Sequence, residues 1–242
     1  MGDRSTQFDK ALMGLRTLVM TGAFEANTRL PEVAVSERLG ISRTPLRQAM
    51  DRLVAEGLLE RIATGGARVA SFTVDDINDA IELRGVIEGT AARMAAERGA
   101  DPLMMGEAER TLAEIDTSLA APDGIDLDAY VRLNAGFHSL LARMAGSLIV
   151  QREIERVVQL PLASPSSFLK EQELIPNFRA SLTRAQWQHK AILAAIRARE
   201  GARAEALTRE HARLARENLE HFAKAEPGIA TRVPGLSLVT PD

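Results

Sequence analysis

The first third of the chain contains three short segments in which apolar side chains recur at helical spacing. Residues 7–21 repeat them every three or four positions and are followed by Gly22, which is typical of a helix end. Residues 33–39 end at Gly40, the residue type that most often follows the last turn of a helix. In residues 43–56 one face is apolar and consists of Leu46, Ala49, Met50, Leu53 and Val54. A short turn that contains glycine separates the last two segments, and this arrangement predicts a helix-turn-helix.

A β-hairpin is expected directly after these helices. Residues 58–62 and 67–72 carry strand-forming side chains on either side of the sequence Ala-Thr-Gly-Gly at 63–66. The glycine pair permits a tight turn with positive backbone angles. Because a hairpin after a helix-turn-helix forms a wing, the sequence predicts a winged helix-turn-helix domain over residues 1–72.

From residue 73 onward, apolar side chains recur at helical spacing almost throughout. Thr73 and Asp76 have the spacing of a capping box, with aspartate in place of the usual glutamate, and predict a helix start. The helix that follows is expected to bury Ile77, Ile81, Leu83, Ile87, Ala91, Met94 and Ala95. Further helices are expected over residues 103–120, 127–145, 148–162, 171–199 and 202–224. Pro176 is expected to interrupt the helix at 171–199, because proline lacks the backbone N–H and clashes with the preceding turn.

The predicted fold class is therefore mainly α. It combines the N-terminal winged helix-turn-helix, with its small β-hairpin wing, and a C-terminal all-α helical bundle over residues 73–225. Residues 226–242 contain three prolines and show no sustained period, so they are expected to form an irregular tail.

Composition excludes several kinds of site and indicates the class of protein. The chain contains no cysteine, which excludes disulfides, a thiol nucleophile and a cysteine zinc cluster, and leaves four histidines as soft metal ligands. No run of 18 apolar residues occurs, and the N-terminus lacks the apolar core of a secretory signal, so we expect a cytoplasmic protein without a membrane partner. Residues 1–72 carry a formal charge of +2 and the remainder carries −5, which is typical of a DNA-reading module on an acidic domain.

The segment that begins the third helix has the residue types of a DNA-reading surface. Ser42 is expected to cap the helix, and Pro45 falls in the first turn, where its missing N–H is not needed. Arg43 and Arg47 lie four residues apart and share the face opposite the apolar one, with Thr44 beside them. An arginine fork can hold O6 and N7 of guanine together, while short hydroxyls and helix N-terminal N–H groups suit phosphates. The alternative is that both arginines are merely solvated, but the preceding short helix and the following hairpin favour DNA binding.

The wing offers two further candidates for DNA contact. Gly66 suits the tight turn and leaves room for a phosphate to approach the backbone. Arg68 lies on the second strand of the wing, although an arginine on a hairpin can equally face solvent.

The string LGISRTPLRQAMDRLVAEGLLE at 39–60, followed by the glycine-pair wing, resembles the GntR family of bacterial transcription regulators. The acidic helical body resembles the FCD ligand-binding domain of the FadR subfamily, so the resemblance covers residues 8–224. For DNA contacts the resemblance implies Ser42, Arg43, Thr44 and Arg47. The family often has another arginine ten residues before Arg43, where this sequence has Val33, so the side chain for one expected contact is missing here.

A candidate metal site is spread over three of the predicted helices. Asn134 and His138 are four residues apart on one helix face, and His189 and His211 lie on two later helices that a bundle can direct to a shared site. Neutral imidazoles with an oxygen ligand suit zinc, nickel or a related divalent ion, although this spacing is also typical of histidines on buried faces. The resemblance implies a metal site, because FCD domains commonly carry an Asp-x-x-x-His pair followed by two histidines. Asn134 replaces that aspartate, and because a neutral amide is a poorer ligand, a weaker metal affinity is expected.

Arg84 is the candidate residue for binding an effector. Arg84 and Glu88 are four residues apart, and on spacing alone they form a salt bridge. The resemblance suggests instead that Arg84 faces a cavity and binds the carboxylate of an effector, since a guanidinium holds a carboxylate through two parallel hydrogen bonds.

Three functions fit parts of this pattern. The first is a ligand-responsive DNA-binding transcription regulator, which binds a palindromic operator as a homodimer and responds to a small organic acid. The second is a histidine-metal hydrolase, against which stands the absence of His-Glu-x-x-His, Gly-x-Ser-x-Gly and Gly-x-x-x-x-Gly-Lys motifs. The third, a helical adaptor without a DNA role, leaves Arg43 and Arg47 unexplained. The sequence favours the regulator, which is not an enzyme, and names neither its effector nor its operator.

Overall fold

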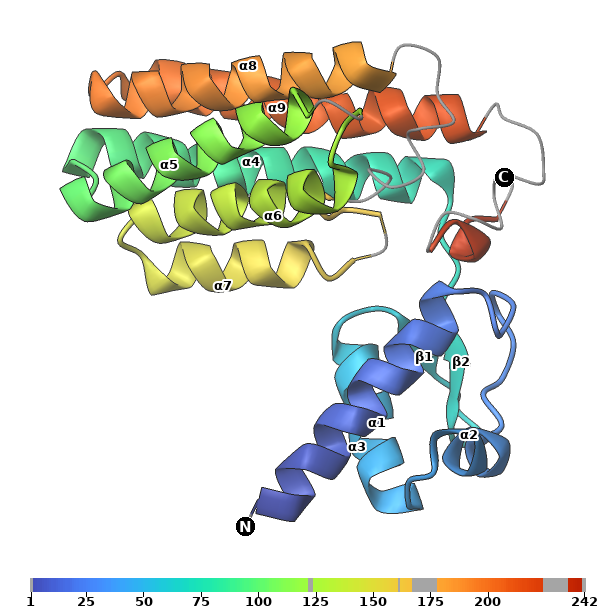
Figure 1. Ribbon diagram of the computed structural model, residues 1–242. Helices are drawn as coiled ribbons and strands as arrows, with labels where there is room; N and C mark the ends of the chain where they lie inside the picture. The colour runs from blue at the N-terminus through green and yellow to red at the C-terminus, as the bar shows by residue number, and fades with distance from the viewer. Residues whose placement is uncertain (1, 122–123, 161, 167–177, 224–234, 241–242) are drawn as a thin grey trace. The chain divides into compact units, whose positions relative to one another are not determined.

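The computed structural model describes residues 2–121, 124–160, 162–166, 178–223 and 235–240. Within these ranges the elements are helical apart from one small antiparallel sheet, so the predicted mainly α fold class is confirmed (Figure 1). The chain divides into two compact units. The first consists of Met1–Ile77, Gln159–Leu162 and Ala225–Asp242, and the second consists of Asn78–Val158 and Ala163–Lys224.

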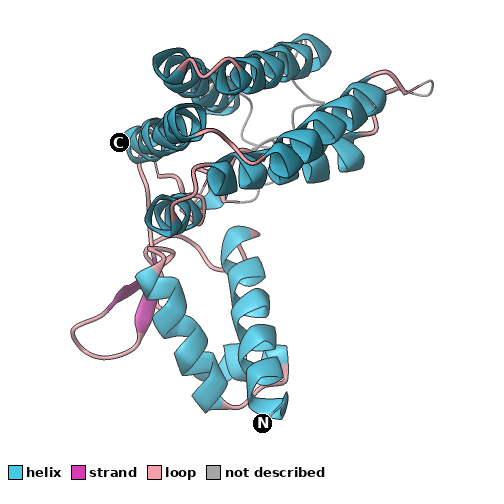
Figure 2. Ribbon diagram, turned by 90° about the vertical axis from the view of Figure 1, so that its left-hand side faces the viewer, coloured by secondary structure: helices cyan, strands magenta, loops and turns pink. Residues whose placement is uncertain are grey.

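The first unit has the element order of a winged helix-turn-helix, as the sequence predicts. Its elements are α1 (Gly2–Met20), α2 (Glu32–Leu39), α3 (Arg43–Ala55), β1 (Leu59–Arg61) and β2 (Ala67–Val69). Gly40 ends α2 in the left-handed conformation, with a φ of 61°, and its N–H donates to the carbonyl of Glu37. The two strands pair as an antiparallel hairpin, with Leu59 opposite Val69 (Figure 2).

The first unit encloses its own hydrophobic core. The apolar face of α3 is buried, since Leu46, Ala49, Met50 and Leu53 are each at most 2% exposed. Leu15 and Val19 of α1 and Leu59 and Val69 of the hairpin join the same core. Burial of one such side chain contributes roughly 1.5–3 kcal/mol, so this face fixes α3 and leaves its opposite face in solvent.

Part of the C-terminal segment also belongs to the first unit. Leu236–Leu238 form a 3₁₀ turn, and Leu238 is completely buried in the core of this unit. The predicted irregular tail at 226–242 lies outside the described residues except at 235–240. Backbone hydrogen bonds hold these described residues against the first unit.

The second unit is a bundle of helices. They are α4 (Val74–Arg98), α5 (Pro102–Leu119), α6 (Leu127–Met144), α7 (Leu148–Val157), α8 (Phe178–Arg197) and α9 (Gly201–Ala223). The first turn of α4 still belongs to the first unit. In the described part of the chain, none of the helices combines the length and the apolar character that a membrane span requires.

The predicted capping box at the start of α4 is confirmed. The N–H of Thr73 donates to Oδ2 of Asp76 over 2.8 Å, and the N–H of Asp76 donates to Oγ1 of Thr73 over 3.1 Å. These hydrogen bonds to the backbone and side chain of Thr73 lower the pKa of Asp76 below its ordinary value.

Two of the predictions about these helices are wrong. Leu83, expected to be buried with Ile81, is 43% exposed. Positions two residues apart on a helix point about 200° away from each other, so they cannot both face one core. The helix expected over 148–162 ends at Val157. The expected break at Pro176 lies outside the described residues, and α8 begins two residues later.

Two glycines allow α4 and α9 to approach each other closely. A Cβ atom at Gly85 would lie 2.8 Å from Cβ of Ala212, and one at Gly89 would lie 3.1 Å from the carbonyl oxygen of Glu205. Any larger side chain would push the helices apart, so the glycines set their separation. Arg84 and Glu88, which precede these glycines, are thereby brought next to α9.

Candidate functional site

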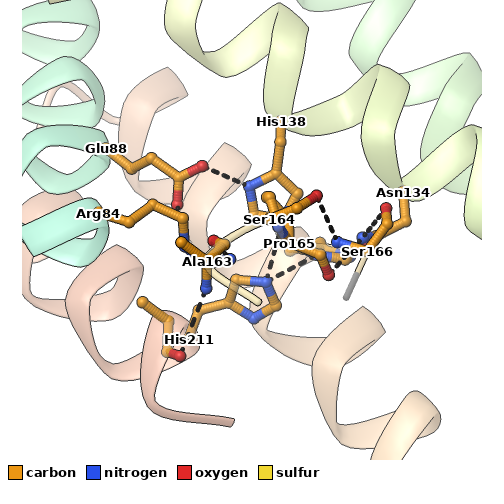
Figure 3. Close-up of polar contacts among 11 residues, drawn as sticks. Arg84, Glu88, Asn134, His138, Ala163, Ser164, Pro165, Ser166 and His211 are labelled. Atoms are coloured by element: carbon orange, nitrogen blue, oxygen red, sulfur yellow. Dashed lines mark hydrogen bonds and ion pairs between the residues drawn. The ribbon is translucent and has the colours of Figure 1, made fainter. Parts of the chain in front are cut away.

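Three histidines from three helices meet in the second unit. His138 of α6, His189 of α8 and His211 of α9 are buried, and their candidate ligand nitrogens all lie within 4.8 Å of one another. Nε2 of His211 lies 3.0 Å from Nε2 of His189 and 3.3 Å from Nε2 of His138. The fold therefore brings together the three histidines expected to share a site. Figure 3 shows His138 and His211 converging from their two helices.

Each imidazole is oriented through its other nitrogen by an oxygen atom. Nδ1 of His138 lies 3.0 Å from Oε1 of Glu88, and Nδ1 of His211 lies 3.0 Å from Oε1 of Gln188. Because a carboxylate or amide oxygen accepts from an N–H, each of these contacts favours the tautomer that carries a proton on Nδ1. Nε2 of each ring therefore keeps its lone pair for a ligand.

Gln186 orients the third imidazole through a buried network. Its side-chain NH2 donates to the carbonyl of Leu112 over 2.8 Å and to Oδ1 of Asp116 over 3.0 Å. The amide oxygen is thus the atom that faces His189, at 3.2 Å from Nδ1. Residues on α5 therefore determine which nitrogen of His189 carries the proton.

The three Nε2 atoms present three lone pairs to one buried point. Burial lowers the pKa of His189 and of His211 well below the ordinary histidine value, and the charge of neighbouring imidazoles lowers it further. Both rings are neutral near pH 7, which is the form that binds a metal. The converging lone pairs repel one another unless a cation lies between them. Three imidazole nitrogens suit zinc or nickel, so the residues present fit a divalent ion.

Asn134 lies one turn before His138 on α6 and is also buried. Its Nδ2 donates to the carbonyl of Pro165 over 3.2 Å and to Oγ of Ser166 over 3.4 Å. Figure 3 shows the side chain directed at these two residues. The amide nitrogen therefore holds the segment at 163–166, and the role of Asn134 as a fourth metal ligand stays a prediction.

Arg84 is almost completely buried, and backbone carbonyls hold its guanidinium. Nη1 donates to the carbonyl of Ala163 over 2.8 Å, and Nη2 donates to the carbonyl of Ala212 over 3.4 Å. Nε lies 3.5 Å from Oε2 of Glu88, so the salt bridge expected from spacing is present. The binding of an effector carboxylate by Arg84 stays a prediction.

Glu88 connects this arginine to the histidines. One carboxylate oxygen faces Nδ1 of His138, and the other faces Nε of Arg84. Burial alone would raise the pKa of Glu88, but its interactions with His138 and with the charge of Arg84 hold it below its ordinary value. The sequence marks Glu88 only as a salt-bridge partner, and the available signal was its position on the same inward helix face as Arg84.

Two cavities flank the histidine cluster. The smaller, of about 40 Å³, is lined by Arg84, Tyr130, Asn134, Ser181, His211 and Asn218 among others. The larger, of about 170 Å³, has Glu88, His138, Ser139, Gln151 and Ser164 in its wall. Burial raises the pKa of Tyr130, so its hydroxyl stays protonated and can donate a hydrogen bond. A guanidinium together with neutral hydroxyl and amide donors makes the smaller cavity suitable for an anion.

Helix α3 exposes the residues expected to contact DNA. Arg43, Thr44 and Arg47 are exposed on the side of α3 that faces away from the core. Ser42 occupies the N-cap position with an extended backbone, at φ −80° and ψ 166°. The prediction that its side chain caps α3 is wrong, because its hydroxyl makes no capping hydrogen bond within the described residues. The hydroxyl instead lies at the exposed N-terminus of the helix.

Acidic residues partner two of the expected DNA contacts. Nε of Arg47 lies 2.9 Å from Oε2 of Glu32 at the start of α2, and Nη2 of Arg68 lies 2.6 Å from Oε2 of Glu60 on β1. The Arg47 side chain is 66% exposed, so this pair is screened by water. Exposed pairs of this kind contribute at most about 1 kcal/mol, and a DNA base or phosphate can displace the acidic partner.

The wing turn contacts Arg29, which the sequence analysis did not identify as a candidate. Gly65 and Gly66 have φ values of 94° and 84°, as expected for the hairpin turn. Nη2 of Arg29 donates to the carbonyl of Gly65 over 2.9 Å, which places an exposed guanidinium at the wing. No local pattern identifies Arg29, because the contact joins residues that are 36 positions apart.

The chain matches the models of two protein families. Residues 10–69 match the family described as bacterial regulatory proteins, gntR family, and residues 79–214 match the FCD domain. The two matches fall on the winged helix-turn-helix and on the bundle that contains the three histidines.

Known relatives are similar over much of this chain. HTH-type transcriptional repressor GlaR of Escherichia coli (strain K12) is 27% identical over 199 residues, which are 81% of this chain and 88% of GlaR. Uncharacterized HTH-type transcriptional regulator YdhC of Bacillus subtilis (strain 168) is 28% identical over 146 residues, which are 60% of this chain and 64% of YdhC. The solved structure of E. coli McbR/YncC superposes with a TM-score of 0.65 at 19% identity, covering 89% of this chain and 97% of that one. McbR/YncC therefore shares the fold.

Proposed function

The chain belongs to the GntR family of bacterial regulatory proteins and carries an FCD domain, and from this premise we propose how it works as a DNA-binding regulator. It binds a palindromic operator as a homodimer. It holds a divalent metal ion, zinc or nickel, between His138, His189 and His211. It responds to a small organic acid that binds beside that ion.

The exposed face of α3 supports the DNA-binding part of the proposal. Arg47 and Arg43 project from the first turns of α3, where a guanidinium fork can reach O6 and N7 of guanine in the major groove. Ser42, Thr44 and the unpaired N–H groups of the helix N-terminus suit phosphate oxygens. Gly66 lets the wing backbone approach the DNA, with Arg68 on the adjoining strand.

The homodimer follows from the small size of one winged module. A single recognition helix offers few base contacts, and two modules related by two-fold symmetry read two half-sites about one DNA turn apart. A palindromic operator matches that symmetry. The chain has no cysteine, so the dimer forms without disulfides.

The observation that carries the metal-binding part is the convergence of three lone-pair-bearing Nε2 atoms. Glu88, Gln186 and Gln188 each occupy Nδ1 of one ring, so the rings cannot satisfy one another by exchanging protons. When bound, a divalent ion supplies positive charge and an open coordination position for an oxygen of the effector. The protein orients the ligands and excludes water from them.

The effector is an anion because the neighbouring donors are cationic or neutral. Arg84 still has N–H groups beyond those bonded to Ala163 and Ala212, and it lines the smaller cavity with His211. A cavity of about 40 Å³ is small, so the effector has few carbon atoms or displaces the segment held by Arg84 and Asn134. A carboxylate matches the guanidinium by two parallel hydrogen bonds.

Two measurements test the proposal separately. Selection of DNA from a random pool yields a palindromic site, and Arg47→Ala weakens binding to it by about 1–3 kcal/mol and relaxes one base position in each half-site. Zinc at 100 times its Kd raises the unfolding free energy of the wild type by about 2.7 kcal/mol and leaves His189→Ala unchanged. His221→Ala, which alters the remaining histidine of the chain, keeps the zinc effect. Loss of the zinc effect in that control, or its absence in the wild type, contradicts the three-histidine site.

The named relatives do not favour a hydrolase. GlaR is named as a transcriptional repressor and YdhC as a transcriptional regulator, and the match to the gntR family covers residues 10–69 of the winged module. The histidine cluster is therefore assigned to effector sensing in this proposal.

A further inference from the structure

Residues 235–240 pair with the backbone that follows the wing. The N–H of Phe72 donates to the carbonyl of Leu238 over 2.9 Å, and the N–H of Thr240 donates to the carbonyl of Phe72 over 2.8 Å. Phe72 directly precedes Thr73, the first residue of the capping box of α4. The C-terminal segment therefore takes up both polar backbone groups of Phe72, in the linker between the wing and α4.

Side-chain packing fixes this segment to the DNA-binding unit. Leu238 is completely buried in the core of that unit, and Leu236 is also buried. The N–H of Gly235 donates to the carbonyl of Met20, the last residue of α1, over 2.7 Å. Gly235 has a φ of 88°, a left-handed conformation that strains any residue with a Cβ atom, and such an atom would also displace the end of the Met20 side chain, 2.8 Å away.

In the sequence, the two paired segments adjoin helices that carry candidate effector-site residues. The linker at Phe72 continues into α4, which carries Arg84 and Glu88. The segment at 235–240 follows α9, which carries His211, in the sequence.

We propose that residues 235–240 form an intramolecular clamp that holds the linker against the winged helix-turn-helix, and that opening this clamp lowers operator affinity. Docking the segment costs backbone entropy, which the buried leucines and the hydrogen bonds of Phe72 offset. A linker ordered before binding loses less entropy when both half-sites are engaged. The effect on operator affinity rests on the proposed function, whereas the clamp itself does not.

Backbone hydrogen exchange of the full-length chain tests the clamp without DNA or metal. Leu238→Ala removes the buried side chain, and Gly235→Ala opposes docking at a different point. Both variants accelerate exchange of the Phe72 amide by about tenfold or more, because its acceptor is on the released segment. The amide of Val69, which donates to the carbonyl of Thr28, is the internal reference and keeps its rate.

A matched variant and a second readout complete the experiment. Ser237→Ala changes an exposed side chain of the same segment and leaves exchange at Phe72 unchanged. Unchanged Phe72 exchange in both Leu238→Ala and Gly235→Ala overturns the clamp. Equal acceleration at Phe72 and Val69 also overturns it, because the segment would then be only part of the general core.

Operator affinity tests the consequence of opening the clamp. With DNA selected by the wild type, both clamp variants bind at least about threefold more weakly, whereas Ser237→Ala binds normally. Wild-type affinity in variants with accelerated Phe72 exchange overturns the link to DNA binding. A wild type that selects no DNA contradicts the proposed function, and the exchange result then still decides whether the clamp exists.

Discussion

The carboxylate of Glu88 holds the imidazole of His138 in a buried hydrogen bond, with 3.0 Å between Oε1 and Nδ1. Because its other oxygen faces Arg84, this carboxylate links the group expected to bind an effector to an imidazole that we propose as a metal ligand. A carboxylate on Nδ1 fixes the ring orientation and makes Nε2 a stronger ligand. The same negative charge also offsets the buried charge of Arg84.

Replacing Glu88 by glutamine tests both roles. Glu88→Gln is expected to weaken zinc binding by about 10–100-fold, since the imidazole loses its carboxylate partner. The unfolding free energy is expected to fall by about 3–5 kcal/mol, because Arg84 keeps a buried charge without a counterion. Calorimetric zinc titration and urea denaturation measure the two effects.

Glu82→Gln is the matched control for this experiment. Glu82 lies on the same helix and pairs with Arg209, but the pair is exposed to solvent. Its loss changes stability by at most about 1 kcal/mol and leaves zinc affinity unaltered. Equal zinc affinities of wild type and Glu88→Gln would show that the carboxylate does not support the metal ligand.

Asn134→Asp is expected to tighten zinc binding in the absence of any effector. An aspartate has no N–H to donate to the carbonyl of Pro165, so its oxygens are repelled from that segment and can turn towards the ion. A carboxylate ligand also neutralises part of the ionic charge. Competition with a chelator measures the gain.

Asn218→Asp separates ligation from a general effect of charge. Asn218 lines the same cavity as Asn134 and is not part of the three-histidine cluster. If both variants tighten zinc binding equally, the gain comes from charge in the cavity, and Asn134 is not a ligand position.

Glu32→Gln is expected to raise the affinity for DNA of random sequence. Glu32 neutralises Arg47 at 2.9 Å in the free protein and repels phosphates near the start of α2. Its loss leaves Arg47 able to pair with any phosphate, so the ratio of specific to random affinity falls. Binding to selected and scrambled duplexes over a salt series measures this change. Arg93→Ala, in the helical unit, should leave both affinities unchanged. A reduced affinity of Glu32→Gln for random DNA would refute the idea that Glu32 keeps Arg47 from pairing with phosphates.

The capping box predicts a pH dependence of stability. The pKa of Asp76 is lower in the folded chain than in the unfolded one, so its carboxylate stabilises the fold above pH about 4. That stabilisation disappears as the pH falls through the lowered pKa. Asp76→Asn is therefore expected to be about 0.3–1 kcal/mol less stable than the wild type at pH 7, and the difference should vanish at low pH.

Thermal denaturation between pH 2.5 and 7 checks this expectation. Asp75→Asn is the comparison, because its carboxylate lies in the same turn but outside the capping box. A difference between Asp76→Asn and wild type that stays constant over the pH range would contradict the assignment.

Much of this fold is encoded in local sequence patterns. The helical period at 43–56 identifies which face of α3 is buried, and Gly40 and the glycine pair at 65–66 mark the turns beside it. The period therefore also identifies Arg43 and Arg47 as exposed. The pattern fails at Leu83, because Leu83 and Ile81 are two residues apart on α4 and cannot both face the core. Only packing decides that Ile81 is the buried one.

Residue spacing determined less about the candidate site. It allowed His138, His189 and His211 to share a site, which the family resemblance implied, but spacing within a helix contains no information on how helices from distant parts of the chain are rotated against one another. The placement of α4 relative to α6 decides that Glu88 reaches His138. Tertiary packing also decides the role of Gln186, because its orientation towards His189 depends on a carbonyl and a carboxylate group of α5.

The sequence by itself determined the winged helix-turn-helix and the helical bundle, because these follow from periods and turns within a few residues. Only the tertiary structure decided that Glu32 restrains Arg47, that Arg29 reaches the wing, and that residues 235–240 pair with Phe72. Each of these contacts joins residues far apart in the chain, and its energy exists only once packing has brought both partners together.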